Sequence, residues 1–319
     1  MSENKKLLKA TGIISSGTFL SRIFGFIRDM VIAKIFGAGF ATDAFFVAFK
    51  IPNLLRRLLG EGALSAAFIP LFTEQFTVKS EEDAWKFASA VFSTLLVILF
   101  TITLLGIIFM PAIITILAPG FYHELHKFNL TVHLTRITFP YIFLISLTAL
   151  SMGILNSLRH FTVPAMSPVL LNFALIGAAF FICPYLKIPV SGLAIGVIIG
   201  GLLQFIFHIP PLIKSGLKFT PDFSFSHPGV KKVVLLMAPS VIGLAVTQFN
   251  IFVDTLIASL LTEGSISYLY YADRVMQLPL GVFGTAIGTA ILPTLSSYAA
   301  KKDMEGMKDT MSFGLRFTF

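Results

Sequence analysis

Long apolar stretches, separated by short polar segments, constrain this chain more than any other feature of its sequence. A helix that crosses about 30 Å of hydrocarbon needs about 20 residues that are mainly apolar. The chain contains about eight such stretches and the beginning of a ninth, so we expect an all-α polytopic membrane protein. The eight stretches run over Leu8–Ile35, Ala44–Phe76, Phe87–Ala118, Thr131–Leu158, Val163–Pro184, Ile188–Ile213, Val233–Leu261 and Ile266–Ala300.

The composition agrees with this class. Of 319 residues, 55% are hydrophobic and 13% are charged, and the mean hydropathy is +0.86, which is far from ordinary soluble usage. The net charge of +8 would suit a nucleic-acid-binding protein, but such proteins carry their basic residues on a soluble face or tail. Most cations here lie between apolar stretches, so we expect no nucleic acid partner. Cys183 is the only cysteine, which excludes an intrachain disulfide.

The Lys and Arg residues between the stretches predict a cytoplasmic N-terminus. Short cytoplasmic loops are enriched in these two residues. With the N-terminus inside, the outer loops hold little more than Lys34, Lys127 and Lys187. The inner side then receives Lys5, Lys6, Lys9, Lys79, Arg159, Lys214, Lys218, Lys231, Lys232, Lys301, Lys302 and Lys308.

A weak internal repeat predicts two related lobes. Aligning Asp29 with Asp254 also superimposes neighbouring small and aromatic residues, and transporters use such symmetry to place a site between lobes. We expect a six-helix lobe over residues 1–216, a cytoplasmic linker over 217–232 and a partial lobe over 233–319. These would be two pseudo-symmetric bundles around a central cavity. The second bundle would be incomplete, because the sequence stops in what looks like the opening turns of a further helix.

Charged residues inside three of the stretches are the candidate functional groups. Such residues are costly in lipid, so each implies a water-filled cavity, a partner or a ligand. Arginines in a cavity would select phosphate or carboxylate, since the planar guanidinium binds two anionic oxygens together. The acids Asp29, Asp43 and Asp273 would orient these arginines. The remaining members of the set are Arg22 and Arg28 in "SRIFGFIRDM", Arg56, Arg57 and Glu61 in "KIPNLLRRLLGEG", and Arg274 in "YYADRVM".

Two alternatives stay open at this stage. Arg56, Arg57 and Glu61 lie near a helix end, where they would also suit snorkelling to the interface or a structural ion pair. The prolines and glycines around Pro52 and Pro279 would serve as hinges or as ordinary kinks. No Walker motif, nucleophile elbow or paired-acid metal motif is present, so we expect no cofactor and no transport driven by ATP bound to this chain. Because moving a ligand across the membrane makes and breaks no bond, we expect a transporter rather than an enzyme.

Two long segments resemble the MurJ (MviN) family of bacterial lipid II flippases, within the multidrug/oligosaccharidyl-lipid/polysaccharide exporter superfamily. They are "SRIFGFIRDMVIAKIFGAGFATDAFFVAFKIPNLLRRLLGEGALSAAFIP" and "YYADRVMQLPLGVFGTAIGTAILPTLS". The resemblance implies two inverted bundles around a cationic cavity, with functional arginines at Arg22, Arg28, Arg56 and Arg274 and with Asp43 among the charged positions. In some members sodium is proposed to bind in the second lobe, which would place a coupling Na⁺ at Asp254.

The resemblance also implies a function. Such a protein would move an undecaprenyl-diphosphate-linked peptidoglycan precursor from the inner to the outer leaflet by alternating access, for cell wall biogenesis. Its partners would be lipid II and membrane lipids, and we expect a monomer in the bacterial cytoplasmic membrane. The nearest alternative is an exporter of another polyprenyl-linked oligosaccharide or of small drugs. A membrane enzyme acting on the same lipid is disfavoured, because the inner loops lack a clustered acidic metal motif.

Overall fold

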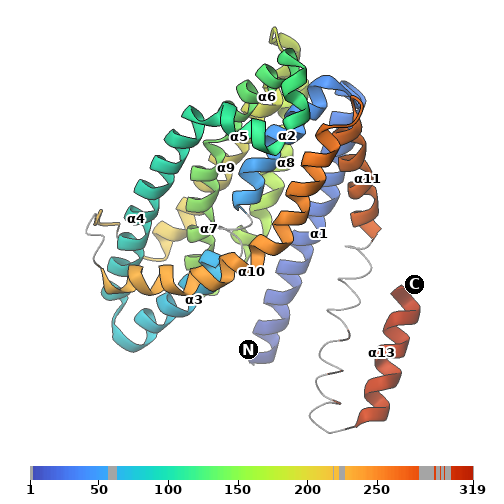
Figure 1. The fold of residues 1–319 in the computed structure, drawn as a ribbon. Coiled ribbons are helices and arrows are strands. Elements are labelled where there is room, and N and C mark those ends of the chain that lie inside the picture. Colours follow the sequence, from blue (N-terminus) through green and yellow to red (C-terminus); the bar gives the residue numbers. More distant parts are fainter. Residues whose placement is uncertain are drawn as a thin grey trace. The chain divides into compact units, whose positions relative to one another are not determined.

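The computed structural model describes residues 3–56, 63–217, 219–222, 227–279 and 303–318, together with Ile291, Leu295 and Tyr298. These residues form helices joined by turns, which confirms the all-α class (Figure 1). The chain divides into two compact units, Met1–Tyr268 and Leu269–Phe319, and each is described by itself. The lobe boundary expected at residues 217–232 stays a prediction.

The first unit contains most of the helices. The α-helices are α1 (Glu3–Phe36), α2 (Phe40–Leu55), α3 (Ser65–Glu74), α4 (Glu81–Ile108), α5 (Met110–Leu117), α6 (Leu125–Thr138), α7 (Tyr141–Ser157), α8 (Thr162–Phe181), α9 (Ser191–Lys214) and α10 (Pro228–Ser259). Short π and 3₁₀ turns lie at Gln75–Lys79, Pro119–His123 and Cys183–Tyr185.

Glycines allow α1, α8 and α9 to pack closely. A Cβ atom on Gly17 of α1 would lie 2.7 Å from the Ala165 Cβ of α8. A Cβ atom on Gly196 of α9 would lie 2.6 Å from the Ala178 Cβ of α8. Small residues let helix backbones approach in this way, which gives packing contacts where lipid provides no hydrophobic driving force. The packing fixes the face of α1 that carries the candidate arginine.

Two expected helices are broken, each beside a proline. The second stretch is described as α2 and α3, with residues 57–62 between them outside the described part. The third stretch breaks at Phe109, just before Pro111, and the fourth breaks at Pro140. Proline has no N–H to donate and crowds the preceding turn, so a change of direction there is expected.

The helix α10 ties distant parts of the first unit together. It begins at Pro228, inside the expected linker, and the Nδ1 atom of His227 accepts a hydrogen bond from the Gly229 N–H. Figure 1 shows α10 slanting across the bundle from the end where α4 begins to the end where α2 begins. It packs against α3, α4 and α5 on the way.

The part of the expected linker that the structure describes runs along α4. The backbone N–H groups of Thr220 and Asp222 donate to the hydroxyls of Ser89 and Ser93, at 3.3 and 3.2 Å. The ring of Phe219 packs on Phe92, with centroids 5.0 Å apart. These contacts attach the entry of α10 to α4.

The helix α11 (Ser265–Pro279) crosses the boundary between the units, and α13 (Met304–Thr318) lies in the second unit. The expected helix Ile266–Ala300 is confirmed as far as Pro279. Of residues 280–302, all except Ile291, Leu295 and Tyr298 lie outside the described part.

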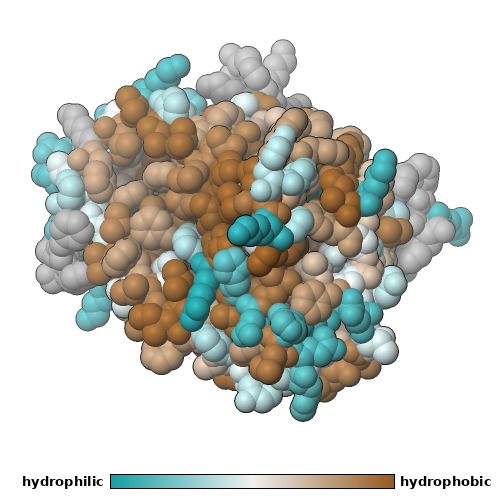
Figure 2. Space-filling view, turned by 90° about the horizontal axis from the view of Figure 1, so that it is seen from above, coloured by the Kyte–Doolittle hydropathy of each residue, from teal (hydrophilic) through white to brown (hydrophobic). Residues whose placement is uncertain are grey.

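Five of the described helical segments are long and apolar enough to cross a membrane. They are Glu81–Ile108, Leu125–Ser157, Thr162–Tyr185, Ser191–Lys214 and Pro228–Ser259. Large apolar side chains are exposed on these segments and beside them: Phe181 is 77% exposed, and Ile116 of the adjoining α5 is 65% exposed. In the end-on view of Figure 2, apolar side chains take up much of the visible surface, and hydrophilic ones lie in scattered patches.

Candidate functional site

Arg28 is held on the buried face of α1. Its side chain is 7% exposed, and its Nε and Nη2 atoms donate to the same oxygen of Asp29, Oδ1, at 2.9 and 2.6 Å. Its Nη1 atom donates to the Asn172 Oδ1 of α8 at 2.9 Å. The guanidinium plane is therefore fixed from two sides, by a carboxylate on its own helix and by an amide on another.

Asn172 was not predicted as a site residue. It is 4% exposed, and its Nδ2 atom donates to the Ser21 carbonyl of α1 at 3.1 Å. One amide thus binds both the side chain and the backbone of α1. The sequence offered a weak signal, because an asparagine in the otherwise apolar stretch Val163–Pro184 needs a partner in lipid.

The other first-lobe candidates are less enclosed. Arg22 is partly buried on α1, and Arg56 follows α2, where its Nε atom donates to the Asn53 Oδ1 at 2.9 Å. The predicted positions Arg57 and Glu61 lie outside the described residues.

The second unit contains Arg274 and Asp273 on α11. The Arg274 guanidinium lies over the Tyr270 ring, 5.2 Å from its centroid, and its Nε and Nη2 atoms donate to the Tyr270 hydroxyl at 3.4 and 3.3 Å. Asp273 is exposed and accepts from the Gln277 Nε2 atom at 2.6 Å. The meeting of Arg28 and Arg274 across a cavity stays a prediction.

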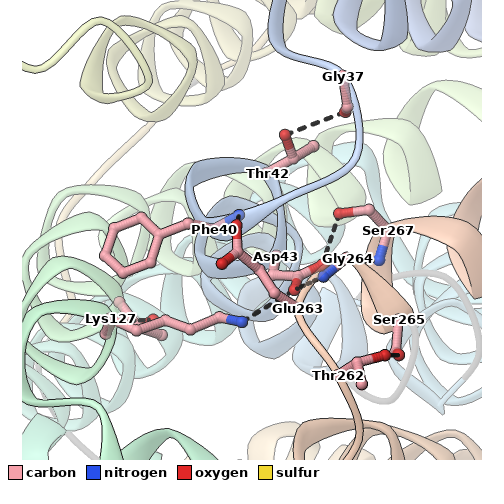
Figure 3. Close-up of polar contacts among 11 residues, drawn as sticks. Gly37, Phe40, Thr42, Asp43, Lys127, Thr262, Glu263, Gly264, Ser265 and Ser267 are labelled. Carbon is pink, nitrogen blue, oxygen red and sulfur yellow. Dashed lines mark hydrogen bonds and ion pairs between the residues drawn. The ribbon is translucent and has the colours of Figure 1, made fainter.

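A second buried cluster is centred on Asp43, in the first turn of α2 (Figure 3). Lys127 of α6 donates its Nζ to the Asp43 Oδ2 at 2.9 Å, and both side chains are at most 5% exposed. The Gly264 N–H donates to the same oxygen at 2.8 Å. The backbone N–H and the hydroxyl of Ser267 donate to Oδ1, at 2.9 and 2.6 Å. We call Asp43, Lys127, Gly264 and Ser267 the Asp43 cluster.

The Asp43 carboxylate caps a helix that belongs to a distant part of the chain. The first N–H groups of a helix lack partners and are usually satisfied by a side chain at the N-cap. Gly264 occupies the N-cap position of α11 at φ +89° and has no side chain, so it cannot cap the helix itself. Asp43 binds both the N-cap amide and the N3 amide of Ser267, and its charge suits the helix dipole.

Three further contacts connect the same elements. The Glu263 Oε1 atom accepts from the Phe40 N–H at 2.6 Å (Figure 3). The Ser259 hydroxyl accepts from the Gly120 N–H at 3.2 Å, and a Cβ atom on Gly120 would collide with the Ser259 backbone. The Lys50 Nζ atom donates to the Thr255 hydroxyl at 2.6 Å. The end of α10 and the segment before α11 are thus bound to α2 and to the turn that precedes α6.

Two expectations about this region are corrected. We predicted that Asp43 orients an arginine, whereas its Oδ2 atom binds Lys127 and Gly264 and its Oδ1 atom binds Ser267. Lys127 was counted as an outer-loop cation, but it is 4% exposed, and its ammonium also lies 4.5 Å from the Phe121 centroid. Its partner lies 84 positions away in the sequence, so no local pattern could reveal the pair.

Asp254, the candidate sodium ligand, lies exposed on α10. Within the described part of the chain, no three His, Cys, Asp or Glu side chains come together as a metal site. Sodium also binds carbonyl and hydroxyl oxygens, so the sodium assignment stays a prediction.

Comparison with known proteins gives one consistent family. A family model described as "Lipid II flippase MurJ" matches residues 32–319. The probable lipid II flippase MurJ of Vibrio cholerae serotype O1 is 42% identical over 320 residues, which cover 98% of this chain and 61% of the relative. The lipid II flippase MurJ of Burkholderia cenocepacia is also 42% identical, over 318 residues that cover 98% and 61%. The chain therefore spans about three fifths of the length of these relatives.

Solved structures agree with this result. The structure of lipid II flippase MurJ in an inward closed conformation matches with a TM-score of 0.79 at 34% identity, over 96% of this chain and 62% of the other. An inward-facing multidrug resistance transporter of the MATE family matches with a TM-score of 0.72 at 14% identity, over 95% and 70%. At that identity the second match shows a shared fold alone.

Proposed function

Because the chain belongs to the lipid II flippase MurJ family, we propose that it provides the diphosphate-binding arginines and the outer closure of a lipid II flippase. The chain is a multi-pass protein of the bacterial inner membrane. The flippase would move the undecaprenyl-diphosphate-linked peptidoglycan precursor from the inner to the outer leaflet by alternating access. No covalent bond changes in this process, so the protein acts as a transporter.

The observation that carries the proposal is the fixed guanidinium of Arg28. Moving a diphosphate out of water costs a large free energy. The buried guanidinium group of Arg28 can offset this cost, because it is permanently charged and donates several hydrogen bonds in one plane. Asp29 and Asn172 hold this fork in one orientation, so little side-chain entropy is lost when the anion binds. Arg22 and Arg56 would add positive charge beside it, and Arg274 would bind the diphosphate from the second lobe.

The Asp43 cluster suits the role of an outer gate. With the N-terminus in the cytoplasm, the starts of α2, α6 and α11 lie at the outer side, and the Asp43 carboxylate holds them together. Opening toward the outside would separate Asp43 from the amides of Gly264 and Ser267. For alternating access, substrate binding must therefore stabilise the open state by at least the free energy that this cluster contributes to the closed state.

The flippase also needs a substrate and a source of energy. Lipid II is the substrate, the polyprenyl tail stays in lipid, and the protein works as a monomer. The membrane potential or a sodium gradient would return the empty cationic cavity to the inner side, because a charge that crosses the membrane field carries about 2.3 kcal/mol per 100 mV. Asp254 is the residue to examine for a sodium contribution.

The test is binding of undecaprenyl diphosphate to the purified protein, measured by native mass spectrometry, together with rescue of cells depleted of their own flippase. Arg28→Ala should lose both. Arg28→Lys keeps the charge but not the planar fork, so it should retain folding and lose most of the affinity. Lys34→Ala removes an exposed cation from the same helix and serves as the matched control.

Full affinity and full rescue in both Arg28 variants would contradict the diphosphate role. Co-purification of an organic cation in place of a lipid diphosphate would favour a drug exporter. Binding of a polyprenyl diphosphate carrying a different glycan, with no preference for lipid II, would favour an exporter of another polyprenyl-linked oligosaccharide.

A further inference from the structure

An apolar cavity of about 300 Å³ lies between α2, α5 and α10. Ile51 and Leu54 of α2 form one wall, Ile113 and Ile116 of α5 a second, and Phe252 of α10 a third. Ile116 is 65% exposed, so the cavity reaches the surface of the first unit. Its polar atoms are those of Lys50 and Thr255, which hydrogen bond to each other at 2.6 Å.

The surroundings of the cavity decide what can enter it. Of the three helices that line the cavity, α10 is long and apolar enough to cross a membrane, and both α5 and α10 carry exposed apolar side chains. Water would find almost no hydrogen-bond partners there, and dry apolar cavities accept hydrocarbon. At about 30 Å³ per water-sized group, 300 Å³ holds about ten such groups, which matches the end of one acyl chain rather than a whole lipid.

We infer that the acyl chain of a membrane phospholipid occupies this cavity and stabilises the closed arrangement of α2, α5 and α10. Two contacts connect α10 to the other elements beside the cavity, namely Lys50 to Thr255 and Gly120 to Ser259. The walls come from different helices, so any movement of α10 away from α2 and α5 takes the cavity apart. A ligand that binds one arrangement and not the other shifts the population toward the first.

This inference goes beyond the proposed function, because it concerns a lipid rather than the transported precursor. The phospholipid is favoured over the polyprenyl tail because phospholipid acyl chains surround every membrane-spanning surface. Chain binding at the cavity does not require that Arg28 binds a diphosphate. The two proposals can therefore fail separately.

The experiment uses the protein in bilayer nanodiscs that contain a phospholipid with a photoactivatable diazirine at the end of one acyl chain. Peptide mapping after illumination should show label concentrated on Ile113, Ile116 and Phe252. In hydrogen exchange, the Gly264 and Ser267 amides should exchange several-fold more slowly in nanodiscs than in a detergent whose hydrophobic part is a rigid steroid, which is too bulky to enter the cavity.

Ile113→Trp fills the cavity and should reduce labelling of Ile116 and Phe252 several-fold. Ile108→Trp, at an exposed position on α4, is the matched control and should change neither. If Ile113→Trp does not fold, Ile251→Trp tests the same cavity from α10. Label spread evenly over all exposed apolar side chains, labelling that Ile113→Trp leaves unchanged, or exchange that does not depend on the lipid would each overturn the inference. A photoactivatable polyprenyl phosphate that labels the cavity more strongly than the phospholipid would also overturn it.

Discussion

Two buried ion pairs in the first unit are built in opposite ways. Arg28 and Asp29 are neighbours in sequence, 2.6 Å apart, and α8 adds one amide to them. Lys127 and Asp43 are 2.9 Å apart, and the pair lies where α2, α6 and the start of α11 meet. Both members of the first pair lie on α1, whereas the second pair joins α2 with α6 and is further bound by the start of α11.

The difference indicates what each pair does. A local pair orients its arginine without holding helices together, which suits a binding group that must remain in place through a transport cycle. A pair assembled from distant elements stabilises one arrangement of them and is lost when that arrangement changes. An exposed pair of the same length, Lys86 to Glu82 at 2.9 Å, contributes to neither task, because water screens it.

The largest effect is expected from removing Asp43. Asp43→Ala leaves the Lys127 ammonium buried beside an uncapped α11, and breaking a buried ion pair costs about 3–5 kcal/mol. Equilibrium denaturant unfolding in detergent should show a loss of this size. The double variant Asp43→Ala with Lys127→Met should recover part of it, since no buried charge remains. If the double variant is as unstable as Asp43→Ala, the cost lies in the lost helix cap instead.

The next effect separates function from stability. Arg28→Ala should weaken binding of undecaprenyl diphosphate by about 10- to 100-fold, because a hydrogen bond to a charged group contributes about 1.5–3 kcal/mol. Asp43→Ala should change the affinity much less for whatever fraction stays folded, since Asp43 is bound to α11 and Lys127. Equal losses of affinity in the two variants would remove the distinction between binding group and gate.

A smaller effect is expected at Asn172. Asn172→Ala removes one hydrogen bond to Arg28 and one to the Ser21 carbonyl, each contributing about 0.5–1.5 kcal/mol. Diphosphate affinity should fall by about tenfold while the folded structure persists. Asn172→Gln keeps the amide on a longer chain and should recover part of the affinity. An Asn172→Ala variant that unfolds without loss of affinity in its folded fraction would make Asn172 purely structural.

The smallest effect is expected for the exposed pair. Glu82→Gln should leave the midpoint of thermal unfolding and the diphosphate affinity unchanged within error, because both side chains are more than half exposed. A clear drop in the midpoint would mean that surface charge, rather than burial, determines how ion pairs act in this protein.

Much of the fold could be predicted from particular stretches of sequence. The apolar run Leu8–Ile35 became α1, and Ile188–Ile213 became α9, because the length of such a run is set by the bilayer. The breaks at Phe109 and Pro140 were not predicted, since hydropathy does not register a local change of direction. Arg28 and Asp29 were predicted together because they are adjacent in the sequence of one helix.

The sequence by itself determined that this protein lies in a lipid bilayer and that it carries guanidinium groups where hydrocarbon would exclude them. Those properties depend on composition and spacing along one helix. Tertiary structure alone decided that Asp43 caps α11, that Lys127 is buried against it and that Asn172 holds Arg28. These contacts join residues from 84 to 224 positions apart, and their energy comes from burial that no single helix provides.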